Sequence, residues 1–161
     1  MRATILVAAI ALCTMPSIRV LADDAVSAER GLYISIIGGC HNCHAEGYSD
    51  SDGRISPSKA MKGSSIGWRS SVFGTKYPSN LRLMVSTLDE DHFFWSMRVL
   101  QTAPPMPAYD IHAMHESDIR SLYQYIKSLG DPGEPAPSTV PPGDEPKTPY
   151  IMFEPPTMPK P

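Results

Sequence analysis

The stretch Cys40-His41-Asn42-Cys43-His44 decides how the rest of this 161-residue chain is interpreted. Two cysteines separated by two residues, with a histidine directly after the second, form the pattern that attaches c-type haem. Cys40 and Cys43 lie about one turn apart, so both thiols can reach the two vinyl groups of one haem, and His44 can give its imidazole nitrogen to the iron. Covalent attachment suits a small domain, because such a domain has little apolar area to hold haem by contacts alone. The sequence therefore predicts one haem c.

Two other roles of a Cys-x-x-Cys pair fit less well. A structural zinc ion needs four ligands, and the chain has no second Cys/His pair to complete the set. A thioredoxin-like thiol pair expects a βαβ context, whereas the hydrophobic periodicity of this chain is helical.

Met106 is the predicted second axial ligand. It lies between Pro105 and Pro107, and proline leaves the backbone few conformers. A thioether ligand raises the reduction potential relative to a second imidazole. The alternative is that Met106 packs on the haem edge while the sixth site is open or filled by a histidine. His41 lies inside the attachment loop, and the other histidines are lone residues: His92, His112 and His115.

The first 22 residues have the features of a secretory signal peptide. Arg2 is followed by an apolar run from Ala3 to Leu12, and Ala22 offers a small residue before a cleavage site. The run is shorter than the roughly 20 residues that span a bilayer, although an uncleaved anchor is the alternative. Cleavage would remove two of the 14 basic residues and no acid, which leaves a net charge of −5. We therefore expect a periplasmic protein with no transmembrane span and no nucleic-acid partner.

Hydrophobic periodicity predicts an all-α fold, with three to four helices packed round the haem in residues 23–130. The first expected helix covers 28–37, with Ser27 as its N-cap, a stop at Gly38-Gly39 and an apolar stripe of Leu32, Tyr33, Ile36 and Ile37. A second covers 88–100. A final helix is capped by Ser117 or His115 and stops at Gly130. Thr87 and Glu90 fit a capping box for the second helix. Residues 45–82 are rich in glycine and serine and are expected to form a loop that packs on the haem.

Residues 131–161 form a predicted Pro-rich extended tail, because they hold 11 of the 17 prolines. One apolar island, residues 150–153, interrupts this tail. Either the whole tail is disordered, or the island docks on the domain or on a partner.

Basic residues gather in one stretch of the chain. Six of them lie between Arg54 and Arg82 without an acidic residue. Either they cluster by chance on solvated loops, or they form a rim that orients an acidic partner.

The helix before Cys40, the Pro-Met-Pro loop and the final amphipathic helix together resemble class I c-type cytochromes over residues 27–130. Residues 67–81 are also similar to bacterial cytochromes related to the haem subunits of periplasmic dehydrogenases. The resemblance implies that the first and last helices cross near Gly31 and either Tyr123 or Tyr125. It also offers four residues for contacts with the haem propionates: Trp68, Arg69, Tyr77 and Asn80.

One feature of the class is displaced in this chain. The class has a proline soon after the haem histidine, and the carbonyl of that proline accepts the imidazole proton. The nearest proline after His44 is Pro57. The hydrogen-bond partner that orients His44 is therefore open at this point.

These observations lead to an expected function in one-electron transfer rather than in catalysis. The partners would be an upstream dehydrogenase and a downstream oxidase or reductase. An alternative is a haem-based ligand binder or sensor with an open or displaceable sixth site. A third possibility is a docking module carried by the Pro-rich tail.

Overall fold

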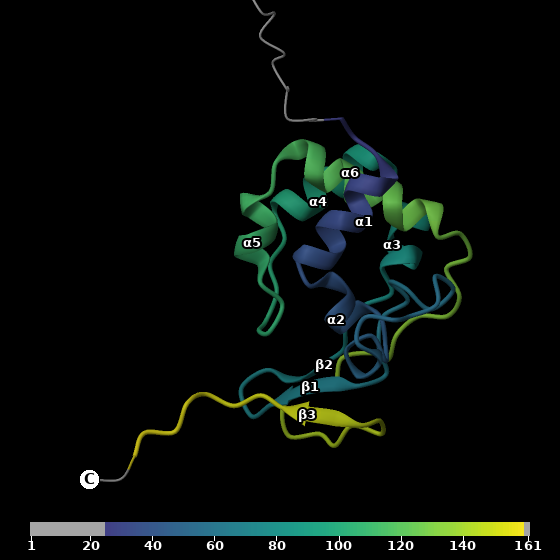
Figure 1. Ribbon diagram of the computed structural model, residues 1–161. Helices are drawn as coiled ribbons and strands as arrows, with labels where there is room; N and C mark the ends of the chain where they lie inside the picture. Colours follow the sequence, from purple (N-terminus) through teal and green to yellow (C-terminus); the bar gives the residue numbers. More distant parts are fainter. Residues whose placement is uncertain (1–24, 160–161) are drawn as a thin grey trace, which may run out of the picture.

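The computed structural model describes residues 25–159 (Figure 1). Within them the chain forms six α-helices, one short 3-10 helix (Ser49–Ser51) and one three-stranded sheet. The helices are α1 (Ala28–Ile37), α2 (Cys40–His44), α3 (Leu81–Thr87), α4 (Glu90–Arg98), α5 (Ala108–Ala113) and α6 (Glu116–Ser128). The strands are β1 (Gly67–Ser70), β2 (Gly74–Lys76) and β3 (Tyr150–Met152). The predicted signal peptide lies outside the described residues.

None of the helices in residues 25–159 combines the length and the apolar character that crossing a membrane requires.

Helix α1 has the predicted bounds, but it turns a different face to the core. The Ser27 hydroxyl accepts a hydrogen bond from the Arg30 amide at 3.1 Å and caps the helix. The buried residues are Gly31, Ile34 and Ser35. The apolar stripe seen in the sequence is 40–61% exposed, and its members are Leu32, Tyr33, Ile36 and Ile37. The buried face of α1 therefore consists of two small residues and Ile34, and the four large residues of the stripe are the more exposed ones.

The crossing of α1 with α6 explains this choice of face. A Cβ at Gly31 would lie 1.9 Å from the Ser121 carbonyl oxygen and 2.6 Å from Tyr125 Cβ. Only glycine allows the two backbones to approach this closely. Of the two tyrosines offered by the family resemblance, Tyr125 is the one that meets Gly31. An ion pair between Arg30 and Asp118, at 2.6 Å, joins the same two helices.

The hydrophobic core lies where α3, α4 and α6 meet. Eight buried residues form one cluster: Met61, Val85, Phe93, Phe94, Ile119, Tyr123, Tyr125 and Ile126. Four of these residues come from α6, so the strong periodicity of that helix in the sequence reflects its central place in the fold. The N-cap of α6 is His115, one of the two predicted residues.

The helix predicted over 88–100 is present as α4, which begins at Glu90 and ends at Arg98. A second helix, α3, precedes it across Leu88 and Asp89 and was not predicted, and the capping box expected at Thr87 is wrong. Thr87 belongs to the end of α3 and does not start a helix. The cap of α4 is Asp89, whose carboxylate accepts a hydrogen bond from the His92 amide at 2.9 Å.

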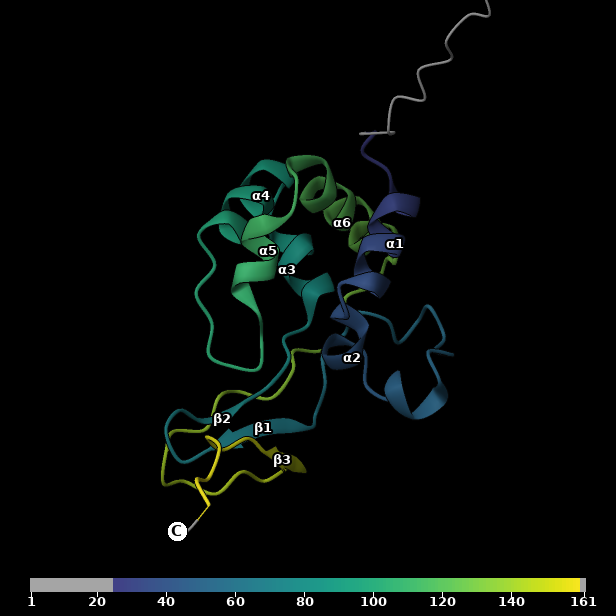
Figure 2. The ribbon, with the colours of Figure 1, turned by 60° about the vertical axis from the view of Figure 1, so that its left-hand side comes forward.

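The all-α fold class is also wrong, because the segment expected to be a loop contributes two strands. The sheet has the order β2-β1-β3, with β1 antiparallel to β2 and parallel to β3. Both views place this sheet beyond α2, apart from the other helices (Figures 1 and 2). Strands of three or four residues are too short to show a clear alternation in the sequence. The third strand also comes from the Pro-rich tail, far away in the chain.

The tail docks on the domain through its apolar island. The Phe153 amide donates to the Arg69 carbonyl at 2.7 Å, and the rings of Phe153 and Trp68 meet edge-on at 5.9 Å. Upstream, Val140 and Thr75 exchange a pair of backbone hydrogen bonds at 3.0 and 2.8 Å. Of the alternatives open from the sequence, the structure therefore shows the tail bound to its own domain.

The α1–α6 crossing leads to a test of stability. We expect Gly31→Ala to lower the free energy of unfolding by about 1–3 kcal/mol, because the added methyl overpacks a backbone contact that cannot move aside cheaply. Denaturant unfolding followed by circular dichroism measures the change. The matched control is Glu29→Ala on the exposed side of α1, which should change stability by no more than about 0.5 kcal/mol. A Gly31→Ala protein as stable as the control would contradict the crossing.

Candidate haem site

The attachment motif forms the short helix α2. Gly39 precedes it with φ +68, a left-handed conformation that ends α1 and redirects the chain. In a helix, residues three and four positions apart lie on one face. Cys40, Cys43 and His44 therefore share a face of α2. Both thiols are free and partly buried.

His44 is held as a neutral imidazole with a defined proton position. Its side chain is buried, and its Nδ1 lies 2.8 Å from the Ser79 carbonyl oxygen. A carbonyl can only accept a hydrogen bond, so Nδ1 carries the proton and Nε2 carries the lone pair. Burial lowers the pKa of His44, and the hydrogen bond to Ser79 opposes this only in part. The histidine thus has the tautomer that a metal ligand needs.

The Ser79 carbonyl is the hydrogen-bond partner of His44 that the sequence left open. It belongs to a residue 35 positions after His44. Sequence reasoning missed Ser79, because a backbone carbonyl carries no side-chain signal and this contact depends on the tertiary fold.

A backbone ladder links α2 to the segment that carries Ser79. The Gly63 amide donates to the His44 carbonyl at 2.9 Å, and the Ser64 amide donates to the Pro78 carbonyl at 3.2 Å. A Cβ at Gly63 would lie 2.6 Å from the Pro78 carbonyl oxygen. Residues 61–64 are therefore packed tightly against residues 78–80, and His44 and Ser79 are held on fixed backbones.

Met106 lies in the connection between α4 and α5. This connection extends to the level of α2 in both views (Figures 1 and 2). The Met106 carbonyl accepts a hydrogen bond from the Thr102 hydroxyl at 2.8 Å, and the side chain is half-buried. Four other methionines lie in or against the hydrophobic core, namely Met61, Met84, Met97 and Met114. The assignment of Met106 as the second ligand stays a prediction.

Trp68 and Arg69, two of the residues expected near the propionates, contact the C-terminal tail instead. Trp68 meets Phe153 as described above. The Arg69 guanidinium lies 2.7 Å from a Glu145 carboxylate oxygen and 4.9 Å from the centre of the Tyr150 ring. The structure therefore gives both side chains partners in residues 145–153.

Tyr77 and Asn80, the other two, also contact the tail. The Tyr77 hydroxyl accepts a hydrogen bond from the Thr148 hydroxyl at 2.8 Å. The Asn80 amide nitrogen donates to the carbonyls of Pro132 and Glu134 at 2.7 and 2.9 Å. All four residues therefore contact the tail, at points between Pro132 and Phe153.

His41, inside the motif, has a structural role. Its ring lies 4.9 Å from the Tyr48 ring and 5.9 Å from the Tyr125 ring, measured between centroids. Its Nε2 lies 3.0 Å from the Ser35 hydroxyl, which fixes α2 against α1. Burial lowers the pKa of His41. These contacts orient the motif against α1 and α6.

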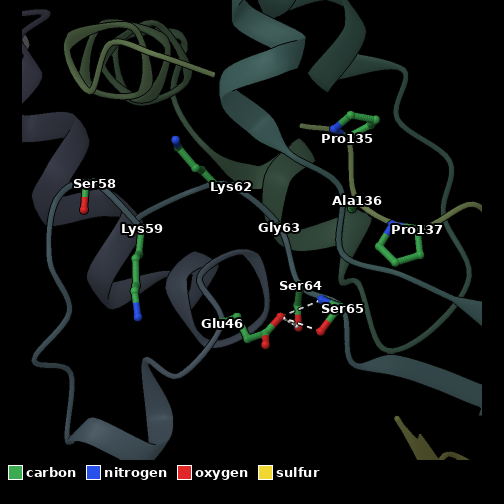
Figure 3. A pocket seen from close by; sticks show the side chains of 10 residues that line it. All are labelled: Glu46, Ser58, Lys59, Lys62, Gly63, Ser64, Ser65, Pro135, Ala136 and Pro137. Atoms are coloured by element: carbon green, nitrogen blue, oxygen red, sulfur yellow. Dashed lines mark hydrogen bonds between the residues drawn. The ribbon is translucent and has the colours of Figure 1, made fainter. Parts of the chain in front are cut away.

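A cleft of about 510 Å³ runs between residues 58–65 and the tail near Pro135. Its side chains do not converge on a common point (Figure 3). Lys59 and Lys62 point in different directions, and the Glu46 carboxylate accepts hydrogen bonds from Ser65 at 2.7 and 2.8 Å. These bonds lower the pKa of Glu46. The cleft is therefore the space between the surface of the domain and the tail that lies against it.

Residues 25–159 contain no group of three or more His, Cys, Asp and Glu side chains arranged to hold a metal ion.

The environment of Cys40 leads to a prediction about thiol reactivity in the haem-free full chain. Burial raises the pKa of Cys40 from its ordinary value of 9.0 to about 11. Because the thiolate is the reactive form, we expect Cys40 to react with iodoacetamide at pH 8 about a hundredfold more slowly than an unperturbed thiol. The rate should rise about tenfold per pH unit up to about pH 11. Peptide mass spectrometry measures the rate, and the urea-unfolded chain is the control. A rate that levels off near pH 9 would contradict this environment.

Comparison with protein-family models, with curated proteins and with solved structures finds no match to this chain. The interpretation of the site therefore depends on its own residues. Those residues are two free thiols and a neutral imidazole on one face of a helix.

Proposed function

We propose that the chain binds one haem c through Cys40 and Cys43, with His44 and Met106 as the protein ligands of its iron, and carries single electrons in the periplasm. The upstream partner would be a dehydrogenase, and the downstream partner an oxidase or reductase. The observation that carries the proposal is the state of His44. A buried, neutral imidazole with its Nδ1 proton on the Ser79 carbonyl lies on the same helical face as two free thiols.

The residues of α2 would each have a defined chemical role. The thiols of Cys40 and Cys43 would add across the two vinyl groups and become thioethers, each sulfur losing its proton to the vinyl carbon. The Nε2 lone pair of His44 is available for iron because Nδ1 keeps the proton. The hydrogen bond to Ser79 makes the imidazole a stronger electron donor. When bound, the haem supplies a one-electron redox couple.

Met106 would close the coordination sphere. A thioether favours the ferrous state, and a closed sphere leaves no site for a substrate. The protein would then change oxidation state without binding or converting a small molecule, which is why we propose an electron carrier and not an enzyme. The chain resembles class I c-type cytochromes in this respect, and the predicted signal peptide favours the periplasm.

Covalent attachment can be tested directly. When the full chain is secreted into the periplasm of a host that matures c-type cytochromes, we expect its mass to increase by one haem and the colour to survive denaturing electrophoresis. Cys40→Ser and Cys43→Ser should each remove one thioether, which shifts the absorption band of the reduced pyridine complex. The control is His112→Gln, which changes an exposed histidine and should retain the full haem. An unaltered chain without haem would reject the proposal.

The second ligand is tested by Met106→Leu, which keeps the volume but removes the sulfur. We expect loss of the near-infrared band of Met–iron bonding in the oxidised protein. We also expect the reduction potential to fall by roughly 100 mV or more, because the thioether favours the ferrous state. For one electron, about 59 mV is a tenfold change in the equilibrium constant. Spectroelectrochemistry measures both. The matched control is Met97→Leu, a methionine packed against the core, which should keep the band.

The same experiment distinguishes the alternative function. If the unaltered reduced protein binds carbon monoxide readily and the oxidised protein lacks the near-infrared band, the sixth site is open. The chain would then be a ligand binder, and Met106 would not be its ligand.

A further inference from the structure

Asn80 joins three parts of the chain. It is 5% exposed. Its side-chain oxygen accepts a hydrogen bond from the Leu83 amide at 3.1 Å and caps α3. Its side-chain nitrogen donates to the Pro132 and Glu134 carbonyls of the tail. The Asn80 amide therefore uses its acceptor for the helix and its donors for the tail.

The residue directly before Asn80 orients the candidate haem ligand. The Ser79 carbonyl accepts the Nδ1 proton of His44 at 2.8 Å. Two neighbours on the other side are also fixed, because the Leu81 and Arg82 amides donate to the Met61 carbonyl at 2.9 and 3.3 Å. The position of the Ser79 carbonyl is thus set from two directions. Residues 61–64 hold it from the core side, and residues 132–134 hold it from the tail side.

We propose that the C-terminal segment positions the haem ligand His44, and that Asn80 is the positioning residue which transmits this effect through the Ser79 carbonyl. The inference rests on the proposed function, since it concerns the ligand of a bound haem. It assigns a redox-tuning role to a tail that the sequence presents only as a Pro-rich extension.

The physical reason lies in the donors of Asn80. The side-chain amide of the buried Asn80 is what joins residue 80 to the Pro132 and Glu134 carbonyls. Without these donors the two carbonyls would turn to water for hydrogen bonds, so residues 132–134 would move away from residue 80. The segment 78–80 would then lose the contacts on its tail side. A longer or less linear hydrogen bond from His44 would make the imidazole a weaker electron donor. A weaker donor stabilises the ferric state less, so the reduction potential should rise.

The test is Asn80→Ser in the haem-loaded full chain. Serine is a good N-cap, so α3 keeps a capping acceptor, and the change is neutral in charge, but the two donors to the tail are lost. We expect the His44 Nδ1 proton, followed by nuclear magnetic resonance of the reduced protein, to exchange with solvent at least tenfold faster. We also expect the ferric-to-ferrous ratio at a fixed applied potential to fall about threefold, which corresponds to about 28 mV.

The matched control is Thr148→Val. It removes another neutral hydrogen bond between the tail and the domain, the one to Tyr77, without touching the Ser79 segment. We expect it to leave the proton exchange and the potential unchanged. Equal shifts in Thr148→Val and Asn80→Ser would overturn the specific role of Asn80.

A second variant acts from the tail side, in case Asn80→Ser fails to load haem. Gly133 lies between the two acceptor carbonyls with φ +65, a conformation that residues with a side chain rarely adopt, so an alanine there would strain this backbone. Gly133→Ala should therefore displace the Pro132 and Glu134 carbonyls without changing residue 80. We expect the same two effects with the same sign.

The outcomes separate this inference from the proposed function. Haem-loaded variants in which neither Asn80→Ser nor Gly133→Ala changes the proton exchange or the potential would overturn the inference and leave the electron carrier intact. An unaltered chain that carries no haem would reject both.

Discussion

The hydrogen bond from His44 Nδ1 to the Ser79 carbonyl is the contact on which the arrangement of this chain depends. A single hydrogen bond of this kind contributes only about 0.5–1.5 kcal/mol, so it cannot order the intervening residues alone. The backbone hydrogen bonds around it order these residues. The Gly63 amide donates to the His44 carbonyl of α2, and the Ser64 amide donates to the Pro78 carbonyl. The state of the imidazole is therefore a property of the whole fold and not of the five-residue motif.

Arg82 fixes the other end of the same segment. Its side chain is 2% exposed, and its guanidinium donates to the carbonyls of Ala60 and Leu129 at 2.7 and 2.8 Å, and also to Pro57 and Asp131. Burial of the charge lowers the pKa of Arg82, and a buried charge is costly unless its donors are satisfied. Here the planar guanidinium group donates to several backbone carbonyls. The Leu129 carbonyl also lies at the negative end of α6, where a cation is favoured. One residue thus joins α3, the end of α6 and the start of the tail.

Local signals explain what the sequence could predict. The Ser27 cap, the glycine stop after α1, the period of α6 and the Cys-x-x-Cys-His motif are each encoded within a few neighbouring residues. Part of what failed depends on distance in the chain, because β3 pairs with β1 across some 80 residues. The strands are also too short to show a pattern. Helix α3, capped by Asn80, was missed, and α4 takes Asp89 rather than Thr87 as its cap. The carbonyl partner of His44 has no signal in the sequence at all. The positions of Trp68 and its neighbours against the tail follow from the pairing of β1 with β3.

The basic stretch of residues 54–82 has a different meaning once the tail is in place. Lys62 pairs with Asp131 at 3.2 Å, and Arg69 pairs with Glu145 at 2.7 Å. Arg82 is buried on carbonyls, and Arg54 pairs with its neighbour Asp52 at 3.2 Å. Exposed pairs of this kind contribute at most about 1 kcal/mol each, so they do not by themselves hold the tail. The pairs with Asp131 and Glu145 lower the positive potential that would attract an acidic partner. Two of the six basic residues, Lys62 and Arg69, therefore have acidic partners in the chain's own C-terminal segment. A redox partner that used this strip would first have to displace that segment.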